Sequence, residues 1–216
     1  MSQKSIVKIA HRGYSDLYGD NNMISFRKAY EEGFDVIELD VQLNADQELV
    51  VHHNLHKAGI YISQMSHSQI RDNQIVFLQD VLEEFRHTNI ILYLDLKGSV
   101  RVAECLVLYL ETNPYPLELM WIASFNQHHL HVLQNSSLMV KLGFITANIF
   151  ENELYETLLQ NVDFFVCDMN ILSSSLVQYV KYQLKKEIYV YTGSNKHDIN
   201  LCQTYEIDGI VSNILF

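Results

Sequence analysis

Charged side chains interrupt several apolar stretches of this sequence, in places where a purely structural strand would carry none. In VIELDVQL (36–43), Glu38 and Asp40 stand two positions apart, so in a strand both side chains point to the same face. Two buried carboxylates repel each other unless a cation or a hydrogen-bond donor compensates them. With Asp95 in IILYLDLK (90–97) they offer three oxygen ligands, which suit a hard divalent cation such as Mg²⁺ or Ca²⁺. The sequence therefore predicts a divalent metal site at Glu38, Asp40 and Asp95.

Histidine and basic residues occupy similar positions at the ends of apolar stretches. His11 ends IVKIAH (6–11) with Arg12 after it, His53 ends ELVVHH (48–53), and Lys97 ends IILYLDLK. Imidazole titrates near neutral pH, so His11 and His53 are candidate acid/base groups. Arg12 and Lys97 carry positive charge that suits a phosphate group. Each residue taken alone also has a structural interpretation, as a solvated side chain or a partner in a local ion pair.

These residues need a fold that brings strand ends together. Short apolar stretches alternate with stretches of helical periodicity, such as 22–33, 100–113 and 174–186. Alternation of this kind predicts a parallel sheet, and eight strands can close a (β/α)₈ TIM barrel, whose chemistry lies at the C-terminal strand ends. Segment 48–53 is interpreted as the return arm of a hairpin, and an open doubly wound sheet is the alternative fold. The eight expected strands are 6–11, 36–43, 90–97, 120–125, 140–145, 162–167, 187–192 and 207–212.

Composition narrows the possible partners and surroundings. The chain has 216 residues, 48% of them hydrophobic, and no linker-like segment, so we expect one domain over 1–216. The net charge of −11 argues against general binding to nucleic acid or anionic membranes. No apolar run is long enough to span a bilayer and MSQKSI lacks a signal-peptide core, so a soluble, cytoplasmic protein without membrane insertion is expected. The oligomeric state is left open.

Other residues that bind metals in many proteins do not form a convincing site here. Cys105, Cys167 and Cys202 are far apart and include no CxxC pair, so we expect reduced thiols in the core. The stretch QHHLH (127–131) has no cysteine or acidic partner at ligand spacing. We interpret it as the solvated start of a helix.

At this point the motifs resemble the glycerophosphodiester phosphodiesterase family. HRGYSDLYGDNNMISF keeps the spacing of the family's opening His-Arg-Gly motif, and IELDV, VVHHN and LYLDLK are similar to its next three motifs. IASFN (122–126) and EIDGIVSN (206–213) are similar to its later Ser-Phe and Asp-Gly-Ile segments. The similarity runs in order over nearly the whole chain.

The resemblance implies a metal-dependent (β/α)₈ barrel that hydrolyses a small-molecule glycerophosphodiester to glycerol 3-phosphate and an alcohol. It assigns acid/base catalysis to His11 and His53 and phosphate binding to Arg12 and Lys97. Glu38, Asp40 and Asp95 would bind Mg²⁺ or Ca²⁺. Further expected pocket residues are Asp20, Asn21, Ser124 and Tyr191.

The sequence also departs from the family pattern at several positions. Asp20 replaces a Glu, Asp95 stands where most members have Glu, Asn54 replaces an Asp, and Tyr191 replaces a Trp. The usual insertion after the His-Asp arm is short or missing, because only 55–77 separates the arm from the next helix. Two alternatives therefore stay open: a lysophospholipase D or sphingomyelinase D-like phosphodiesterase, and a catalytically impaired barrel that binds phosphodiesters.

Overall fold

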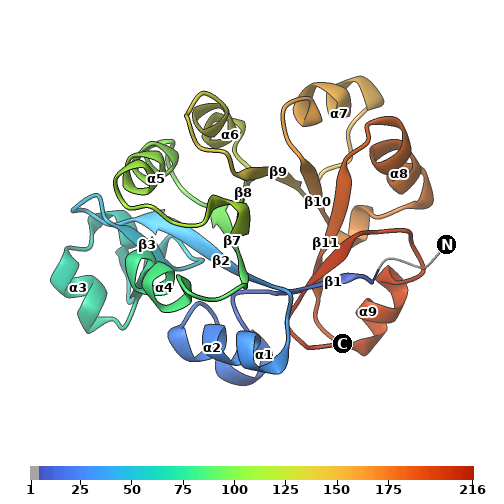
Figure 1. Ribbon diagram of the computed structural model, residues 1–216. Helices are drawn as coiled ribbons and strands as arrows, with labels where there is room; N and C mark the ends of the chain where they lie inside the picture. The colour runs from blue at the N-terminus through green and yellow to red at the C-terminus, as the bar shows by residue number, and fades with distance from the viewer. Residues whose placement is uncertain (1–4) are drawn as a thin grey trace.

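Eight parallel strands close into a ring. The computed structural model describes residues 5–216, so most of MSQKSI, on which the signal-peptide expectation depends, lies outside it. Around the ring, each strand pairs with the next in parallel, and β1 pairs with both β12 and β2. Figure 1 shows helices placed around the outside of this ring, as in a (β/α)₈ barrel. The eight strands are β1 (Val7–Ala10), β2 (Val36–Leu43), β7 (Ile91–Leu96), β8 (Met120–Ser124), β9 (Lys141–Thr146), β10 (Phe164–Asp168), β11 (Glu187–Gly193) and β12 (Gly209–Ser212).

All eight barrel strands overlap the stretches expected from the sequence. The alternative of an open sheet is wrong, because β1 pairs with β12 and this pairing joins the two edges that an open sheet would leave free. The expected return arm is also confirmed, because β3 (Leu49–Val51) runs antiparallel to β2, and β6 (Val76–Phe77) extends this pair.

Helices lie outside the strands and, except for α1 (Ser15–Tyr18), bury side chains against the rest of the protein. Several begin with side-chain caps. The Asn22 side chain accepts from the backbone N–H groups of Ile24 and Ser25 at the start of α2 (Met23–Glu32). The Asn195 side chain accepts from those of His197 and Asp198 at the start of α9 (Lys196–Cys202). The expected helix over 174–186 forms as α8 followed by a π-helix, Gln178–Gln183. The helices are α1 (Ser15–Tyr18), α2 (Met23–Glu32), α3 (His67–Asp72), α4 (Leu78–Phe85), α5 (Arg101–Thr112), α6 (Gln127–Gln134), α7 (Asn152–Leu159), α8 (Ser174–Val177) and α9 (Lys196–Cys202).

Aromatic side chains fill part of the barrel interior. The ring centroids of Trp121, Phe164 and Tyr189 lie 5.2 to 5.6 Å apart. Lys141, at the start of β9, sits 4.0 Å from the Trp121 ring and forms an ion pair with Glu187. These side chains come from the early or middle part of their strands. They leave the space for a pocket at the other end, where the strands finish.

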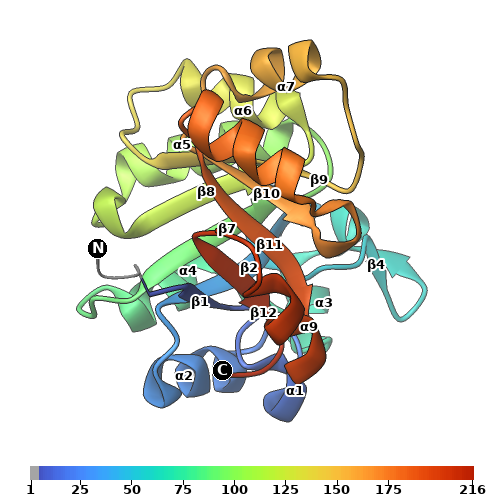
Figure 2. The ribbon, with the colours of Figure 1, turned by 90° about the vertical axis from the view of Figure 1, so that its right-hand side faces the viewer.

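The segment between β2 and β7 forms the reduced insertion expected from the sequence. Within 55–77 it contains a two-stranded hairpin, β4 (His56–Lys57) and β5 (Ile60–Tyr61), followed by a 3₁₀ turn (Ile62–Gln64), α3 and β6. Ala58 and Gly59 both have positive φ, 51° and 79°, which suits a tight two-residue hairpin turn. Figure 2 shows this hairpin projecting from the barrel.

Candidate active site

Three carboxylates meet where β2 and β7 run side by side. Glu38 and Asp40 lie on the same face of β2, and Asp40 is paired in register with Asp95 of β7. All three side chains are buried, at 2 to 6% exposure. One carboxylate oxygen from each residue lies within 4.8 Å of the other two. This grouping can hold a metal ion, because hard divalent cations prefer several carboxylate oxygens.

Two cations and an amide surround these acids. Lys97 Nζ lies 2.5 Å from Asp95 Oδ2 and 3.2 Å from Asp40 Oδ1, while Arg12 Nε lies 3.2 Å from Asp40 Oδ2. Asn21 donates its side-chain N–H to Asp40 Oδ2 over 2.8 Å. Asp40 therefore has most of the contacts that compensate the negative charge of these acids. Glu38 accepts a backbone N–H, that of Arg12, over 2.8 Å.

The pKa values of the three acids shift in different directions. Burial raises the pKa of Glu38 well above its ordinary value, and the charges of Asp40 and Asp95 add to that shift. Burial raises the pKa of Asp95 to about 7, although Lys97 opposes it. Burial acts on Asp40 in the same direction, but Lys97 and Arg12 outweigh it and hold its pKa below the ordinary value. A bound cation would favour the ionised forms of Glu38 and Asp95, against the burial and the neighbouring negative charges that raise their pKa values.

His11 is held by a residue from the far end of the chain. Its Nδ1 donates to Asn213 Oδ1 over 2.6 Å, which leaves Nε2 with the lone pair. Asn213 is itself positioned by Ser15, whose hydroxyl donates to the same oxygen over 3.2 Å. Burial, reinforced by the charge of Arg12, lowers the pKa of His11. The ring is therefore neutral at neutral pH and can accept a proton.

The turn after β1 aims Arg12 at the carboxylates. Arg12 and Gly13 both have positive φ, 57° and 79°, which lets the chain reverse directly after His11. A Cβ at Gly13 would lie 2.5 Å from Ser25 Oγ and 2.8 Å from the Ser25 backbone, so only glycine fits. The His-Arg-Gly motif thus combines an acid/base candidate, a cation and the glycine that the turn requires.

His53 lies on the loop after β3, and Gln42 of β2 fixes that loop. The Gln42 side-chain amide donates to the backbone oxygens of His52, His53 and Asn54, over 2.5, 3.2 and 2.9 Å. Because side chains alternate along a strand, Gln42 shares the face of Glu38 and Asp40. His53 Nδ1 lies 3.0 Å from the Asn54 side-chain oxygen. Asn54 thus supplies a neutral hydrogen-bond acceptor at this position.

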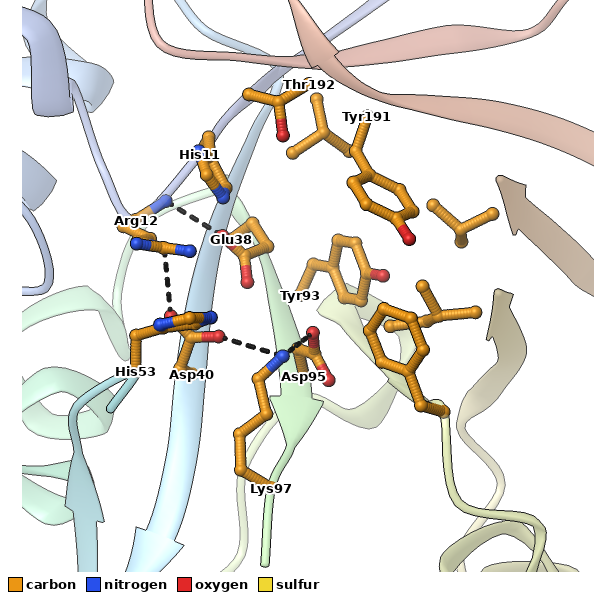
Figure 3. Close-up of a pocket in the computed structure, with 14 residues that line it drawn as sticks. His11, Arg12, Glu38, Asp40, His53, Tyr93, Asp95, Lys97, Tyr191 and Thr192 are labelled. Atoms are coloured by element: carbon orange, nitrogen blue, oxygen red, sulfur yellow. Dashed lines mark hydrogen bonds and ion pairs between the residues drawn. The ribbon is translucent and has the colours of Figure 1, made fainter. Parts of the chain in front are cut away.

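All seven residues expected to carry the chemistry line one pocket of about 150 Å³ at the strand ends. Figure 3 shows His11, Arg12, Glu38, Asp40, His53, Asp95 and Lys97 on one side of this pocket. The rest of the wall comes mainly from aromatic and aliphatic side chains: Tyr93, Phe125, Ile145, Val166, Tyr191 and Val211. The pocket therefore has a charged half that suits a phosphate and an apolar half.

Comparison with known proteins agrees with this geometry. The sequence model of the glycerophosphoryl diester phosphodiesterase family matches residues 11–214. The chain belongs to this family. The match includes the His-Arg-Gly turn, the β2 carboxylates, Lys97 and Asn213.

Individual relatives in this family are distant. An uncharacterized protein of Bacillus subtilis is 30% identical over 109 residues, which cover 42% of this chain and 45% of that protein. The human lysophospholipase D GDPD1 is 25% identical over 153 residues, which cover 60% of this chain and 45% of the human protein. These matches span a little under half the length of the relatives.

Solved structures of the family confirm the fold. A phosphodiesterase of Oleispira antarctica, solved with the product sn-glycerol-3-phosphate, superposes with a TM-score of 0.85 at 19% identity. The comparison covers 95% of this chain and 92% of that one.

The remaining residues that the family resemblance suggested do not all reach the main pocket. Tyr191 lines it, whereas Asp20 and Asn21 line an adjoining cavity of about 530 Å³ that also touches Arg12 and His53. Asp20 binds Arg12, with 2.8 Å between its Oδ2 and Nη1. Ser124 lines neither of these cavities. It is fully buried, and its hydroxyl donates to the backbone oxygen of Leu96 over 2.9 Å.

The interpretation of QHHLH as a solvated helix start is wrong for one residue. His129 is fully buried, lies 2.9 Å from Ser124 Oγ through Nδ1, and donates from Nε2 to Ser99 O over 2.9 Å. His128 and His131 are exposed, as expected. His129 and Leu133 are four residues apart and share the inner face of α6. This spacing was the sequence signal that could have indicated that His129 is buried.

One buried carboxylate oxygen is free to bind a cation. Asp95 Oδ1 is buried and has no hydrogen-bond partner among the described residues. Such an atom normally has a partner, because leaving a buried polar group unpaired costs about 1–3 kcal/mol. The donor set of three carboxylates, with one oxygen unpaired, suits a divalent cation.

Proposed function

We propose that this chain hydrolyses glycerophosphodiesters to glycerol 3-phosphate and an alcohol, and that 1–216 is a single catalytic domain. The observation that carries the proposal is the convergence of two histidines, two cations and three carboxylates in one pocket. The Oleispira antarctica relative was solved with sn-glycerol-3-phosphate, which supports this substrate class. Among residues 5–216, none of the helices combines the length and hydropathy that crossing a bilayer requires. A cytoplasmic location is part of the proposal.

The residues divide the chemistry between them. Arg12 and Lys97 bind the phosphoryl oxygens and neutralise the charge that grows on them. His11, neutral and held through Nδ1 by Asn213, accepts a proton at Nε2 from the attacking nucleophile. His53, which lines the same pocket, donates a proton to the leaving alkoxide.

The proposal includes a divalent cation, Mg²⁺ or Ca²⁺, held by Glu38, Asp40 and Asp95. When bound, it supplies further positive charge next to the phosphoryl oxygens. Lys97 is the present counterion of Asp95, at 2.5 Å. With the charge of Asp95 compensated by such a cation, Lys97 would be available to bind the phosphate.

An assay with matched variants tests the proposal. Glycerophosphocholine and glycerophosphoethanolamine are incubated with Mg²⁺, Ca²⁺ or a chelator, and the glycerol 3-phosphate released is measured. We expect turnover with one of the cations and none with chelator. His11→Ala and His53→Ala should each lower kcat by about 10²- to 10⁴-fold. His128→Ala, which removes an exposed histidine on α6, is the control and should keep full activity.

Two outcomes would contradict this assignment. Near-normal rates in both histidine variants would remove acid/base catalysis from His11 and His53. Cation binding without hydrolysis of any diester would instead favour the alternative of a barrel that binds phosphodiesters without cleaving them.

A further inference from the structure

Two buried polar side chains, Ser124 and His129, lie against the backbone on either side of Lys97. Both are fully buried, and neither lines the catalytic pocket. Ser124 is the last residue of β8, and His129 is the third residue of α6. Burying a polar side chain is unfavourable unless it forms hydrogen bonds. The bonds of these two residues therefore indicate what they hold in place.

Both residues bond to the segment that carries Lys97. The Ser124 hydroxyl donates to Leu96 O over 2.9 Å, and His129 Nε2 donates to Ser99 O over 2.9 Å. Leu96 directly precedes Lys97, and Ser99 follows it by two residues. A bond on each side restricts how the Lys97 backbone can shift.

The two residues also contact each other. A carbonyl oxygen only accepts, so the imidazole hydrogen that bonds to Ser99 O is on Nε2. Burial lowers the pKa of His129, so the ring is neutral at neutral pH and Nδ1 carries a lone pair. Nδ1 lies 2.9 Å from Ser124 Oγ. The single hydroxyl hydrogen of Ser124 therefore has two acceptors, Leu96 O and His129 Nδ1, and loss of the hydroxyl would remove both links.

The backbone at Lys97 needs this support because the ladder between β7 and β8 ends just before it. The last paired residues of these two strands are Asp95 and Ala123. On the side of β2, the Lys97 N–H donates to Val41 O over 2.9 Å. On the side of β8, the side-chain bonds take the place of the ladder.

The same hydroxyl oxygen also fixes an aromatic ring beside the Lys97 ammonium. Ser124 Oγ accepts the Asn126 N–H over 3.0 Å, which holds the turn that contains Phe125. The centroid of the Phe125 ring lies 5.1 Å from Lys97 Nζ, a cation–π contact. The backbone and the ammonium of Lys97 are thus both held through Ser124.

We propose that Ser124 and His129 are positioning residues that hold Lys97 where its ammonium meets the phosphate of the substrate. The inference rests on the proposed function, in which Lys97 binds the phosphoryl oxygens. Ser124 and His129 act through the backbone of 96–99 and through Phe125. A lysine side chain is long and flexible, and a displacement of about 1 Å at such a contact is enough to weaken it.

Binding of glycerol 3-phosphate tests this role without requiring turnover. Calorimetric titrations in chelator and in Mg²⁺ measure the affinity, and thermal melts establish that each variant is folded. Ser124→Ala and His129→Leu should each weaken binding about 10-fold. His129→Gln keeps an N–H donor for Ser99 O and should bind within about threefold of the wild type. His131→Leu, at an exposed histidine of the same helix, is the control and should bind as the wild type does.

A double-mutant cycle separates positioning from stability alone. In Lys97→Ala, which removes the ammonium, Ser124→Ala and His129→Leu should have no further effect on the affinity. Residues with a purely structural role would lower Tm and leave the affinity of the folded protein unchanged, or would weaken binding equally in both backgrounds. Either result would overturn the proposal, as would wild-type affinity in Lys97→Ala.

The remaining outcomes are also informative. If His129→Leu does not fold, Ser124→Ala completes the same cycle, because it breaks the links to Leu96 and to His129 together. Coupling to Lys97 in binding, with no hydrolysis of any diester, would support the positioning role and contradict only the proposed hydrolysis.

Discussion

Nδ1 of His11 lies 2.6 Å from the side-chain oxygen of Asn213, a residue 202 positions later in the chain. This contact selects the ring nitrogen that faces the substrate and keeps the imidazole in place. Burial lowers the pKa of His11, while Asn213 opposes that shift only in part. The catalytic properties proposed for His11 therefore depend on a neutral amide partner.

Replacing Asn213 should alter catalysis in a way that depends on charge. Asn213→Ala should lower kcat about 10- to 100-fold, because the ring loses its orientation. Asn213→Asp should instead raise the pKa of His11 and move the acid limb of the pH–rate profile to higher pH, because a neighbouring carboxylate favours the imidazolium. Profiles of kcat/KM for both variants measure this. An unshifted limb in Asn213→Asp would separate Asn213 from catalysis.

Gln42→Leu should impair His53 without harming the cation site. The change leaves the backbone oxygens of His52, His53 and Asn54 without their shared donor, so we expect kcat to fall about 10- to 100-fold. Cation affinity should stay within about threefold, because Glu38 and Asp40 keep their strand positions. In a His53→Ala background the same change should have no further effect on kcat. An equal loss in both backgrounds would mean that Gln42 acts by a different route.

The pKa shifts of the three acids predict how the stability of the protein depends on pH. The pKa of Asp95 is raised from 3.8, its ordinary value, to about 7 in the folded protein. Between these two pH values the folded state therefore keeps a proton on Asp95 that the unfolded state has released. Stability of the cation-free protein should therefore fall as the pH rises from about 4 to about 7. Glu38, with its raised pKa, acts in the same direction, whereas the lowered pKa of Asp40 gives a contribution that is lost only at lower pH. Cation affinity should rise over the upper part of this window.

Asp95→Asn checks this dependence. The variant should show a smaller change of Tm between about pH 5 and pH 8 in chelator, because the proton no longer has to leave. It should also lose most of the Tm increase that Mg²⁺ or Ca²⁺ gives the wild type. Thermal melts with and without cation measure both quantities. A wild-type response to cation would show that Asp95 is not a ligand.

Gly143→Ala should destabilise the barrel itself. An added Cβ would lie 2.2 to 2.6 Å from the ring of Phe164, which is fully buried in the barrel interior. Overpacking of this kind costs about 1–3 kcal/mol, which a denaturant melt detects. Met139→Ala, at a side chain that is 87% exposed, is the control and should change stability by less than about 0.5 kcal/mol. Equal stability of the two variants would contradict the packing described around Phe164.

Strand positions and the charged residues on them were predictable from sequence because their signal is local. The period of two in VIELDVQL places Glu38 and Asp40 on one face, and the parallel register then brings Asp95 beside them. His11 and Lys97 follow from the same reasoning, because each lies at the end of an expected strand. The fold class follows from the number and alternation of these strands.

The supporting residues were not predictable in the same way. Asn213 and Gln42 act through hydrogen bonds to groups that are distant or on a loop, and no periodicity indicates such partners. Ser124 and His129 were misplaced because their polar side chains were expected to face solvent or substrate. They instead satisfy the backbone oxygens of Leu96 and Ser99 on either side of Lys97.

The closure of the barrel has a consequence for how the protein is made. All seven residues proposed for the chemistry lie within the first 97 positions, so a ribosome completes them early. Yet β1, which precedes His11, keeps one unpaired edge until β12 has been synthesised, and Asn213 comes only after β12. Nascent chains that already carry all seven side chains therefore still lack the strand that closes the barrel and the amide that holds His11. Until β12 is made, the free edge of β1 is a site at which such chains can aggregate.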